Sequence, residues 1–588
     1  MDEGLRARVR AWIEQDPDPT TQAELEALLA SGDEAELRER FAGPLEFGTA
    51  GLRGLLGAGE TRMNRAVVIR TSHGLGQALL ARDPGYAARG VVIGYDGRIL
   101  SRELARDTAE VLAAQGFRVL LSEDLCPTPL LAYALTHFGA AAGVMVTASH
   151  NPPEYNGYKV YADNGAQIVP PWDEEIAAAI AAAPGAKGVP RLELEAALAA
   201  GQVETFGEAI DEAYLQGVLA LASPDRSGRA ELPIVYTPLH GVGKKLLVQA
   251  LARAGFAKVD VVAAQAEPDG AFPTVRFPNP EEKGALDLAL ALARERGAAL
   301  IIANDPDADR LACVVRAASG DYVPLTGNEV GVLLGSYLLR RPPTPGLPLD
   351  GEGPRLVMAS IVSSPQLGAY AELHGVEYGE TLTGFKWIAN DALTALRERD
   401  AQFVFGYEEA LGYTVGTLVR DKDGIGAALV LCELAAKLAG EGRTLLDELE
   451  ALARETGLFV SGQRSTTFPG QEGQQVMREI MTRLRQDPPR EIGGVSVLAM
   501  RDYVGGERLV LASGARERLS LPASDVMVFE LATLDRIIAR PSGTEPKIKF
   551  YFDVREPIAA GEPLAAARER AQARLVRLQD AFVALAQG

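Results

Sequence analysis

The fold of this chain can be worked out from the stretch Thr147-Ala148-Ser149-His150-Asn151-Pro152-Pro153-Glu154-Tyr155-Asn156-Gly157-Tyr158-Lys159. The apolar residues 143–146 directly before it are typical of a buried strand. Two consecutive prolines exclude a helix after that strand. Ser149 is therefore expected on a stiff loop at a strand end, which is where ligands bind in open α/β sheets. A serine in that place is either a nucleophile or part of an ordinary turn, and the stretch alone favours the turn.

A strand-helix-strand pattern occurs three times along the chain, beginning at residues 90–96, 233–241 and 355–360. Each copy has the lengths of a right-handed parallel unit, and each is followed by another apolar strand that ends in a polar loop. The three polar loops carry different side chains, which are Ser149 in the first, Asp305, Asp307 and Asp309 in the second, and Glu408 and Glu409 in the third. Three similar α/β domains packed around one cleft would bring these loops together.

The length of 588 residues is too great for a single hydrophobic core. We expect a helical extension at residues 1–40 and four domains at 41–205, 206–325, 326–457 and 458–588. Pro17 and Pro19 divide the extension into two short helices. Residues 183–206 show no strong strand pattern and are expected to form a linker. The last domain combines alternating strands with a long helix over residues 563–586, which predicts an α+β fold.

Composition excludes several classes of function. The net charge of −20 argues against nucleic acid or an anionic membrane surface as a partner. No apolar run is long enough to span a membrane, and the N-terminus lacks the apolar core of a secretory signal. Cys126, Cys313 and Cys432 lie far apart in or beside apolar runs, which is typical of reduced, buried thiols. A cytoplasmic location is therefore expected.

The acidic loop predicts a metal site. Asp305, Asp307 and Asp309 alternate directly after a strand, where their carboxylates would repel one another unless a cation lay between them. Hard oxygen ligands suit Mg²⁺. An EF-hand fits poorly, because Arg310 and Arg316 occupy the positions where that motif needs glycine and glutamate. A solvated acidic turn is the alternative, and the preceding buried strand disfavours it.

A loop near the C-terminus has the composition of a phosphate site. Its arginine and lysine, its hydroxyls and its glycine are all suited to phosphate oxygens, although a plain turn is the alternative. The residues concerned are Arg540, Ser542, Gly543, Thr544 and Lys547. Further candidate ligand contacts are Arg53 after a glycine-containing loop, Lys159, His240, and Lys386 in a second glycine loop with Thr383 and Gly384. Glu408 and Glu409 are neighbours that point to different sides if extended, so only one is expected to reach a ligand.

Six motifs in this order resemble the α-D-phosphohexomutases, and in particular the phosphoglucomutase branch. The resemblance runs from about residue 40 to the C-terminus. It rests on residues 47–54 (Phe-Gly-Thr-Ala-Gly-Leu-Arg-Gly), 147–152 (Thr-Ala-Ser-His-Asn-Pro), 305–310 (Asp-Pro-Asp-Ala-Asp-Arg), 382–386 (Leu-Thr-Gly-Phe-Lys), 406–409 (Gly-Tyr-Glu-Glu) and 540–546 (Arg-Pro-Ser-Gly-Thr-Glu-Pro). It implies a heart-shaped enzyme of four domains, with three similar mixed α/β domains, a C-terminal α+β domain, and a mobile fourth domain.

The resemblance also implies roles for the candidate residues. Ser149 would carry a phosphoryl group, and one Mg²⁺ per active site would be held by Asp305, Asp307, Asp309 and a phosphate oxygen on Ser149. Arg53, Lys159 and His240 would surround the reacting phosphate, with the general acid and base among them left open. The implied substrate contacts are His150, Arg310, Thr383, Gly384, Lys386, Glu408, Glu409, Arg540, Ser542, Gly543, Thr544 and Lys547.

The reaction implied is the interconversion of glucose 1-phosphate and glucose 6-phosphate, with glucose 1,6-bisphosphate as intermediate and activator, by a monomer or homodimer. Many members of the family have serine after the sugar-loop glutamates where this chain has Ala410. A phosphopentomutase or phosphomannomutase therefore stays open. Two other classes are a Mg²⁺-dependent sugar phosphatase of the haloacid dehalogenase type, in which Asp305 would be the nucleophile, and a sugar-phosphate binding protein without catalysis.

Overall fold

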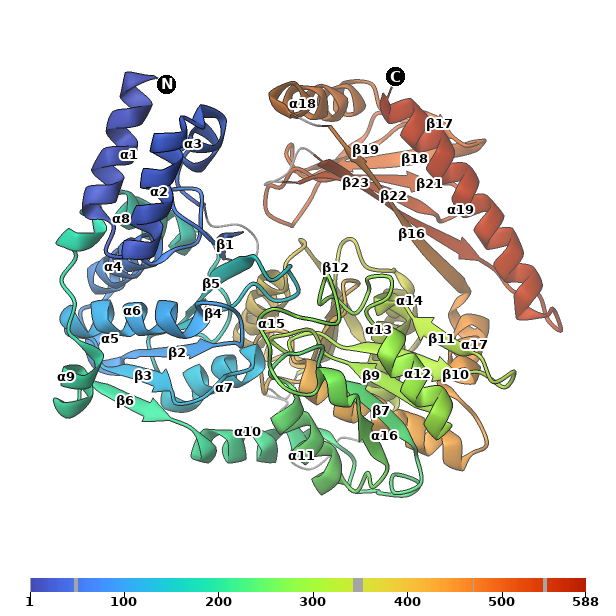
Figure 1. The fold of residues 1–588 in the computed structure, drawn as a ribbon. Coiled ribbons are helices and arrows are strands. Elements are labelled where there is room, and N and C mark those ends of the chain that lie inside the picture. Colours follow the sequence, from blue (N-terminus) through green and yellow to red (C-terminus); the bar gives the residue numbers. More distant parts are fainter. Residues whose placement is uncertain (1, 47–50, 342–352, 469, 543–546, 588) are drawn as a thin grey trace.

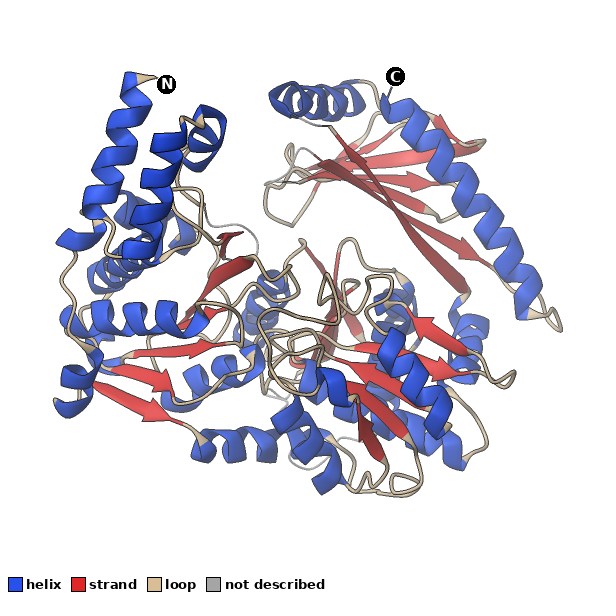
Figure 2. Cartoon of the chain, viewed as in Figure 1, coloured by secondary structure: helices blue, strands red, loops and turns tan. Residues whose placement is uncertain are grey.

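Four sheets follow one another along the chain, and each belongs to its own domain (Figures 1 and 2). The computed structural model describes residues 2–46, 51–341, 353–468, 470–542 and 547–587. Within these ranges, the first three sheets are mixed and the fourth is antiparallel.

The N-terminal extension forms three helices where the sequence predicted two: α1 (Glu3–Gln15), α2 (Pro19–Ser31) and α3 (Glu34–Arg40). The additional break lies at Gly32, which ends α2 in the left-handed conformation at a φ of 73°. Asp33 then begins α3 by accepting a hydrogen bond from the backbone N–H of Glu36. The expected break at Pro17 and Pro19 is present as well. Trp12, Leu25 and Phe41 belong to the apolar cluster that joins these helices.

Domain 1 is built on a six-stranded sheet in the order β1-β5-β4-β2-β3-β6. Its strands are β1 (Leu52–Leu55), β2 (Val91–Tyr95), β3 (Val119–Ser122), β4 (Ala142–Val146), β5 (Tyr155–Ala162) and β6 (Val203–Phe206). Its helices are α4 (Arg65–Arg82), α5 (Tyr86–Arg89), α6 (Ser101–Ala114), α7 (Thr128–Phe138), α8 (Trp172–Ala181), η1 (Ala186–Gly188) and α9 (Leu194–Ala199). The expectation of a plain linker at 183–206 is wrong, because β6 pairs with β3 at the edge of this sheet. Only Val203 and Phe206 of β6 are buried, which is too few apolar residues for a recognisable pattern.

Domain 2 contains a five-stranded sheet in the order β11-β10-β9-β7-β8. The strands are β7 (Ile234–Thr237), β8 (Val259–Val261), β9 (Leu300–Ala303), β10 (Ala312–Arg316) and β11 (Tyr322–Leu325). The helices are α10 (Glu208–Leu221), α11 (Lys244–Ala254), η2 (Ala263–Gln265) and α12 (Asp287–Arg296).

Domain 3 contains a four-stranded sheet in the order β13-β12-β14-β15. The strands are β12 (Arg355–Ser360), β13 (Glu377–Thr381), β14 (Gln402–Glu408) and β15 (Gly412–Val415). The helices are α13 (Gly327–Arg340), α14 (Gln366–Leu373), α15 (Phe385–Arg399), α16 (Gly424–Gly440) and α17 (Leu445–Thr456).

These three domains share one four-stranded unit. Three parallel strands are followed by a fourth, antiparallel strand, in the orders β3-β2-β4-β5, β8-β7-β9-β10 and β13-β12-β14-β15. In each unit the turn between the third and fourth strand carries the candidate loop, so Ser149, Asp305 and Glu409 occupy equivalent places. The repeat predicted from the sequence is thereby confirmed.

Domain 4 contains an eight-stranded sheet in the order β16-β23-β22-β21-β18-β19-β20, with β17 paired to β18. The strands are β16 (Leu458–Thr467), β17 (Glu491–Ile492), β18 (Val495–Asp502), β19 (Glu507–Val510), β20 (Arg516–Arg518), β21 (Met527–Leu531), β22 (Arg536–Pro541) and β23 (Lys547–Glu556). Helices α18 (Gly470–Gln486) and α19 (Leu564–Gln587) supply Met481 and Phe582 to the apolar core against this sheet. The predicted α+β character and long last helix are present.

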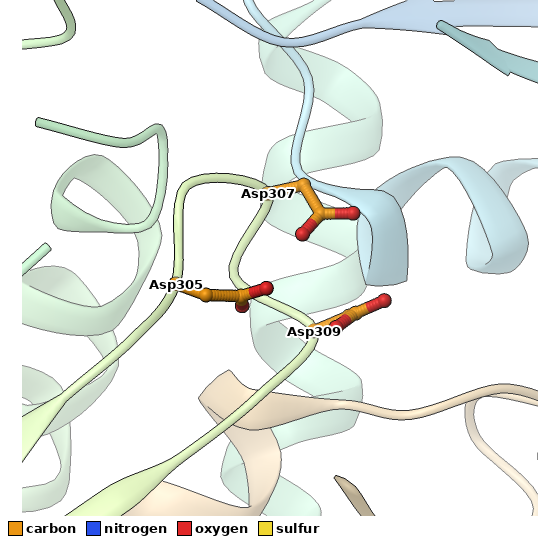
Figure 3. Close-up of side chains that lie close together, drawn as sticks. All are labelled: Asp305, Asp307 and Asp309. Carbon is orange, nitrogen blue, oxygen red and sulfur yellow. The ribbon is translucent and has the colours of Figure 1, made fainter. Parts of the chain in front are cut away.

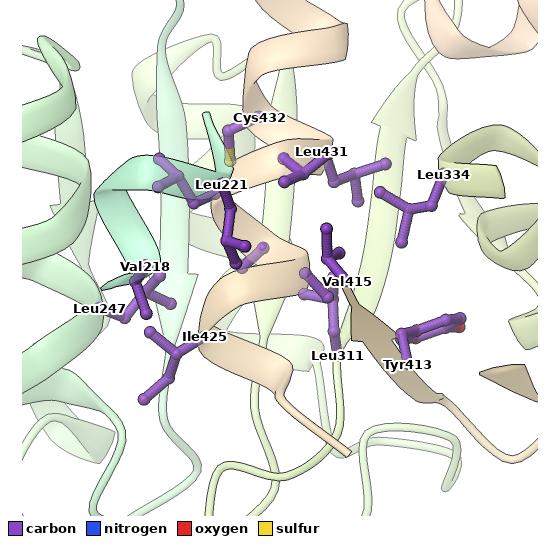
Figure 4. Close-up of a cluster of buried hydrophobic side chains, with 14 of the residues drawn as sticks. Val218, Leu221, Leu247, Leu311, Leu334, Tyr413, Val415, Ile425, Leu431 and Cys432 are labelled. Atoms are coloured by element: carbon purple, nitrogen blue, oxygen red, sulfur yellow. The ribbon is translucent and has the colours of Figure 1, made fainter. Parts of the chain in front are cut away.

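Domains 2 and 3 share one hydrophobic core. Helix α16 contributes Ile425, Leu431 and Cys432, which pack with side chains of domain 2 such as Leu221 and Leu247 (Figure 4). Burial of this extent favours a fixed arrangement of the two domains. Among the described helices, none combines the length and the apolar character that a membrane-crossing segment needs.

Candidate active site

Ser149 lies on the turn between β4 and β5, as predicted. Its backbone has a φ of 52°, in the left-handed region that non-glycine residues rarely adopt. The side chain is buried, and its Oγ donates a hydrogen bond to Asp305 Oδ2 at 2.6 Å. His150 Nδ1 lies 3.2 Å from the same Oγ. Burial and the nearby guanidinium groups of Arg310 and Arg53 hold the pKa of His150 well below its ordinary value, so this ring is neutral.

A buried arginine organises the loop around Ser149. Arg98 donates hydrogen bonds to the backbone carbonyls of Ser149 at 2.6 Å, Pro152 at 2.9 Å and Tyr155 at 3.1 Å. Its guanidinium also forms an ion pair with Asp96 at 3.4 Å. Because both side chains of the pair are fully buried, their charges depend on these partners. The left-handed backbone conformation at Ser149 is therefore stabilised by the hydrogen bonds of one side chain, that of Arg98.

The three aspartates of domain 2 converge as the sequence predicted. Asp305, Asp307 and Asp309 are buried, and ligand oxygens from all three lie within 4.8 Å of one another (Figure 3). Among the described residues, Asp307 Oδ1 and Asp309 Oδ1 have no hydrogen-bond partner. Unpartnered buried carboxylate oxygens are costly without a ligand, and oxygens of this kind are what Mg²⁺ prefers. The donor set therefore fits a divalent metal ion.

Three cations surround these carboxylates. Lys159 Nζ lies 2.8 Å from Asp307 Oδ2 and 2.9 Å from Asp309 Oδ2. Lys422 Nζ lies 3.1 Å from Asp309 Oδ2, and Arg310 Nε lies 3.9 Å from both Asp305 Oδ2 and Asp309 Oδ1. The sequence predicted strong repulsion unless a cation lay between the carboxylates, and these buried side chains already offset much of that repulsion.

These cations set the protonation of the site. Burial lowers the pKa of Lys159, but the carboxylates of Asp307 and Asp309 outweigh it and the net shift is upward. Burial raises the pKa of Asp309, and here Lys159 and Lys422 outweigh it, so the net shift is downward. Burial and the neighbouring Asp307 and Asp309 raise the pKa of Asp305 well above its ordinary value. Lys159 is consequently a cation at neutral pH.

The loops of the first two domains are joined at the metal site. Thr128, at the start of α7, donates from Oγ1 to Asp307 Oδ2 at 2.7 Å and from its backbone N–H to the Asp307 carbonyl at 2.9 Å. His240 follows β7, and Val242, two residues further on, donates from its backbone N–H to the Pro306 carbonyl of the same loop at 2.8 Å. A Cβ on Gly241 would lie 2.4 Å from Pro306 Cα, so only glycine fits there. The His240 ring itself bonds to Thr274, with Nε2 and Oγ1 2.8 Å apart.

The third loop supplies the two glutamates, and they point to different sides as predicted. Glu408 Oε1 accepts a hydrogen bond from the Gly384 N–H at 2.7 Å. Glu409 instead receives the hydroxyls of Ser360 at 3.3 Å and Ser363 at 3.4 Å. Burial raises the pKa of Glu408, and burial together with Glu408 raises the pKa of Glu409 to about 7. Glu408 therefore contacts the glycine loop 383–386, while Glu409 contacts the end of β12 and the residues that follow it.

The second and third loops are bonded to each other through their backbones. Arg310 forms an isolated antiparallel bridge with Gly412, and the N–H of Leu311 donates to the Leu411 carbonyl at 3.0 Å. The residues that follow the three aspartates are therefore fixed to those that follow the two glutamates.

The remaining predicted residues occupy the margins of the site. Arg53, on β1, donates to Asn151 Oδ1 at 2.9 Å, and burial with Arg310 lowers its pKa to about 10. Lys386 is the second residue of α15, and burial lowers its pKa. Thr383 Oγ1 is buried with no hydrogen-bond partner among the described residues.

The phosphate-loop candidates lie at the junction of β22 and β23 in domain 4. Arg540 pairs with Lys549 across these strands, and the Ser542 N–H donates to the Lys547 carbonyl at 2.7 Å. Gly543 and Thr544 lie outside the described residues.

Sequence reasoning missed Arg98, Thr128 and Lys422. The signal for Lys422 was the charged run 420–423, which stands directly before the apolar helix α16. Arg98 lies three residues after the end of the strand β2. A polar residue just after a parallel strand is the pattern from which Ser149 was predicted as a site residue, so Arg98 could have been found in the same way. Asp421 is a further addition. It accepts hydrogen bonds from Tyr161 at 2.6 Å and from Gln167 at 2.7 Å, so domain 1 holds the segment that carries Lys422.

Comparison with known proteins identifies this arrangement. Models of the phosphoglucomutase/phosphomannomutase α/β/α domains I, II and III match residues 44–186, 212–320 and 326–455. The chain is 43% identical to a "probable phosphomannomutase" of Haemophilus influenzae, covering 88% of this chain and 99% of that protein. It is 34% identical to a phosphopentomutase of Mus musculus (96% and 92% covered) and 37% identical to a phosphoglucomutase of Staphylococcus epidermidis (88% and 92% covered).

The chain therefore belongs to the phosphoglucomutase/phosphomannomutase family. It is an enzyme of the α-D-phosphohexomutases, as the motifs indicated, and its four-domain α/β architecture is the one expected. The crystal structure of a Paramecium phosphoglucomutase in an open form has the same fold, with a TM-score of 0.65 and 18% identity over 91% of this chain and 94% of that one.

Proposed function

We propose that this protein is a phosphosugar mutase that interconverts glucose 1-phosphate and glucose 6-phosphate through a phosphoserine at Ser149. The observation that carries the proposal is the contact of Ser149 Oγ with Asp305 Oδ2 at 2.6 Å, in a buried site lined by cations. A hydroxyl in such a site is suited to carry a phosphoryl group, because the charge of the group is offset on several sides.

The proposed reaction has two transfers. In the first, a free hydroxyl of the sugar monophosphate attacks the phosphorus on Ser149. The new P–O bond forms, the bond from phosphorus to Ser149 Oγ breaks, the attacking hydroxyl gives its proton to a base, and Ser149 Oγ takes up a proton. The product is a sugar bisphosphate, which turns over in the site. In the second transfer, Ser149 Oγ gives up its proton and attacks the other phosphate, the bond from that phosphorus to the sugar oxygen breaks, and the sugar oxygen takes up a proton. The isomeric monophosphate is released, so the enzyme returns to its starting state.

The metal site fits this chemistry. Asp305, Asp307 and Asp309 would hold one Mg²⁺ together with a phosphate oxygen on Ser149. When bound, the ion would offset negative charge on the phosphoryl group.

The cations of the site have separate tasks in this proposal. Lys159 is fixed by two aspartates, so it is suited to stabilise charge and to exchange a proton at the reacting phosphate. Arg53 donates a hydrogen bond to Asn151 and thereby contacts the loop that carries Ser149. His240 is directed to Thr274, which favours Lys159 and Arg53 over His240 as the groups beside the reacting phosphate. His150 lies beside Ser149 Oγ on the same loop, and Arg310 lies 3.9 Å from Asp305 Oδ2, which accepts the hydrogen bond of Ser149.

The sugar and the second phosphate would occupy the remaining loops. Glu408, fixed by Gly384, is suited to accept hydrogen bonds from sugar hydroxyls, with Thr383 and Lys386 beside it. Arg540, Ser542 and Lys547 would hold whichever phosphate is not reacting, together with Gly543 and Thr544. The bisphosphate that forms as intermediate would also act as activator, because it phosphorylates Ser149 of any molecule that has lost its phosphoryl group.

The sugar is tested by direct competition. The named relatives include a phosphomannomutase, a phosphopentomutase and a phosphoglucomutase, and Ala410 removes a hydroxyl from the sugar loop. Measuring kcat/KM on glucose, mannose and ribose 1-phosphates side by side separates the alternatives. We expect the glucose substrate to give the highest value, and a higher value for ribose or mannose assigns the protein to that sugar.

The phosphoryl carrier is tested by mass spectrometry of peptides from protein incubated with sugar bisphosphate. Phosphate on Ser149 supports the mutase, whereas phosphate on Asp305 supports the phosphatase. The Ser149→Ala variant is expected to lose all measurable turnover, with Ser336→Ala, which removes a buried hydroxyl from α13, as the matched control. Wild-type activity in Ser149→Ala excludes the phosphoserine, and bound phosphate without turnover of any sugar identifies a binding protein.

A further inference from the structure

Two strands lead from one contact between domains 3 and 4 into the proposed substrate site. Glu380 lies on β13, four residues before Gly384 of the glycine loop 383–386, which adjoins Glu408 of the sugar loop. Arg536 begins β22, four residues before Arg540 of the phosphate loop. Arg536 and Arg540 lie on one strand, which rises about 3.3 Å per residue, so about 13 Å separates them, and β13 ends at Thr381, three residues before Gly384. The relative position of Glu380 and Arg536 is thereby transmitted to both loops.

The contact between these two residues is a partly buried ion-pair network. Arg536 NH1 lies 2.8 Å from Glu380 Oε1, and Arg501 NH1 lies 3.1 Å from Glu380 Oε2. The Nε of Arg536 is held within domain 4 by Asp553 Oδ2 at 2.7 Å. Only 11% of the Arg536 side chain is exposed, and 23% of the Glu380 side chain. A charge pair in such a place is screened less than a surface pair and has a fixed geometry.

Arg536 reaches the sugar loop by a second route. Its NH2 group also donates a hydrogen bond to the backbone carbonyl of Ser363. The Ser363 hydroxyl in turn accepts the N–H of Glu409 at 3.0 Å. A single arginine of domain 4 therefore contacts the strand before the glycine loop and the residue that holds the glutamate loop.

The same face of β22 carries the apolar part of this contact. Alternate residues of a strand share a face, so Arg536, Ile538 and Arg540 point the same way. Ile538 packs in an apolar cluster that contains Leu382 and Ile361 of domain 3. Apolar contacts have no preferred direction and tolerate sliding, whereas charged hydrogen bonds fix register. The ion pairs are thus the part of the contact that determines the orientation.

We propose that Glu380 and Arg536 are positioning residues, which hold domain 4 in the orientation that sets Arg540 against the sugar loop. This inference rests on the proposed function, because it assumes that both loops hold one sugar phosphate. Neither residue is a catalytic residue, since they contact each other and Ser363 rather than the reacting atoms. Substitution of either residue is expected to lower the affinity for the sugar bisphosphate, while the groups around Ser149 keep their positions.

The test compares two glutamates that each accept hydrogen bonds from two arginines. In Glu380→Gln the affected arginines belong to the opposite domain. In the control, Glu556→Gln, both partners, Arg570 at 2.7 Å and Arg574 at 2.8 Å, lie in domain 4 itself. We expect Glu380→Gln to raise the KM for glucose 1-phosphate about tenfold and to increase the dependence on added bisphosphate. The kcat at saturating bisphosphate should change less than threefold. Glu556→Gln should leave these values unchanged.

A second measurement needs no turnover. Hydrogen exchange of residues 361–364 and 382–386, without sugar phosphate, should become faster in Glu380→Gln and in the milder Arg501→Gln but not in Glu556→Gln. Unchanged exchange and unchanged KM overturn the positioning role, and so does an equal effect of Glu556→Gln. If the wild type turns over no sugar phosphate while exchange still responds at these segments, the proposed function fails and the interdomain contact stands.

Discussion

The ammonium group of Lys422 lies 3.1 Å from Asp309 Oδ2, so a side chain of domain 3 reaches a carboxylate of domain 2. Asp421 stands beside it, 3.2 Å from the same ammonium group, and Tyr161 of domain 1 donates to Asp421 at 2.6 Å. Three domains therefore meet at the carboxylates, and the charge balance of the metal site depends on all of them.

Replacement of Lys422 is expected to separate metal binding from turnover. In Lys422→Met the aspartates lose one compensating charge, so the apparent affinity for Mg²⁺ should rise about tenfold while kcat falls about 100-fold. Initial rates measured over a range of Mg²⁺ concentrations give both values. Lys437→Met is the control, since Lys437 on α16 lies against the ring of Tyr337 much as Lys422 lies against Phe385. A kcat within twofold of wild type contradicts the prediction.

Asp307→Asn should remove the stabilisation that Mg²⁺ gives to the folded protein. A ligand that binds only the folded state raises Tm in proportion to the logarithm of its concentration over its Kd. The wild type is expected to gain several degrees in millimolar Mg²⁺, and Asp307→Asn to gain about one degree or less. Without metal, the variant should be less stable than the wild type, because the buried ion pair of Asp307 with Lys159 is lost and the folded protein favours the ionised carboxylate. Asp163→Asn, outside the site, should gain as much Tm from Mg²⁺ as the wild type does. A gain of the wild-type size in Asp307→Asn would show that Asp307 does not bind the metal.

Arg98→Met should destabilise domain 1 and inactivate the enzyme together. The change leaves the carbonyls of the Ser149 loop without their donor and Asp96 without its ion-pair partner. Removal of one member of a buried pair costs about 3 kcal/mol, or roughly 6–12 °C in Tm for a domain of this size. Calorimetry measures the shift. The double variant Arg98→Met/Asp96→Asn removes the unpaired charge and should recover part of the loss. No recovery would mean that the carbonyl contacts alone matter.

Glu409 should give the protein a pH-dependent stability. Its pKa is about 7 in the folded state, against an ordinary value of 4.5, so the folded form keeps a proton that the unfolded form releases. The stabilisation is complete below pH 4.5 and is lost as the pH rises through 7. Glu409→Gln stays neutral, so its Tm relative to wild type should be higher at pH 8 than at pH 5. Glu450→Gln, at an exposed position on α17, should give a constant difference. A constant difference for Glu409→Gln as well would show that burial does not hold this proton.

The parts of the fold that could be predicted are those with a local signal. The loop of Ser149 follows an apolar strand and contains two prolines, and the loops of Asp305 and Glu408 repeat that order, so strand ends could be located from neighbouring residues. Strand β6 and helix α3 could not be located in this way. The strand β6 has two buried side chains in four residues, and the break before α3 depends on the left-handed conformation of Gly32.

The parts of the site that could not be predicted depend on contacts between domains. Lys422 approaches Asp309 only because α16 packs against domain 2, and nothing near residue 422 indicates that target. The charges of Lys159 and Arg310 were visible, but their distances to the carboxylates follow from the pairing of β5 and from the bridge between Arg310 and Gly412. His240 was expected beside the phosphate on its place after β7, and this role stays a prediction; the bond of its ring to Thr274 had no signal in the sequence.

The bridge between Arg310 and Gly412 has a consequence for any attempt to change the sugar that this enzyme accepts. The loop that would recognise the sugar and the loop that would hold the metal share a backbone bridge, with the Leu311 and Leu411 hydrogen bond next to it. Replacing the turn after Glu409 by a longer turn, or by one of another turn type, is therefore expected to displace the aspartates as well. A redesign of substrate specificity would need to replace the turn of the aspartates and the turn of the glutamates together. A library that varies only one of these turns is expected to contain mostly inactive variants.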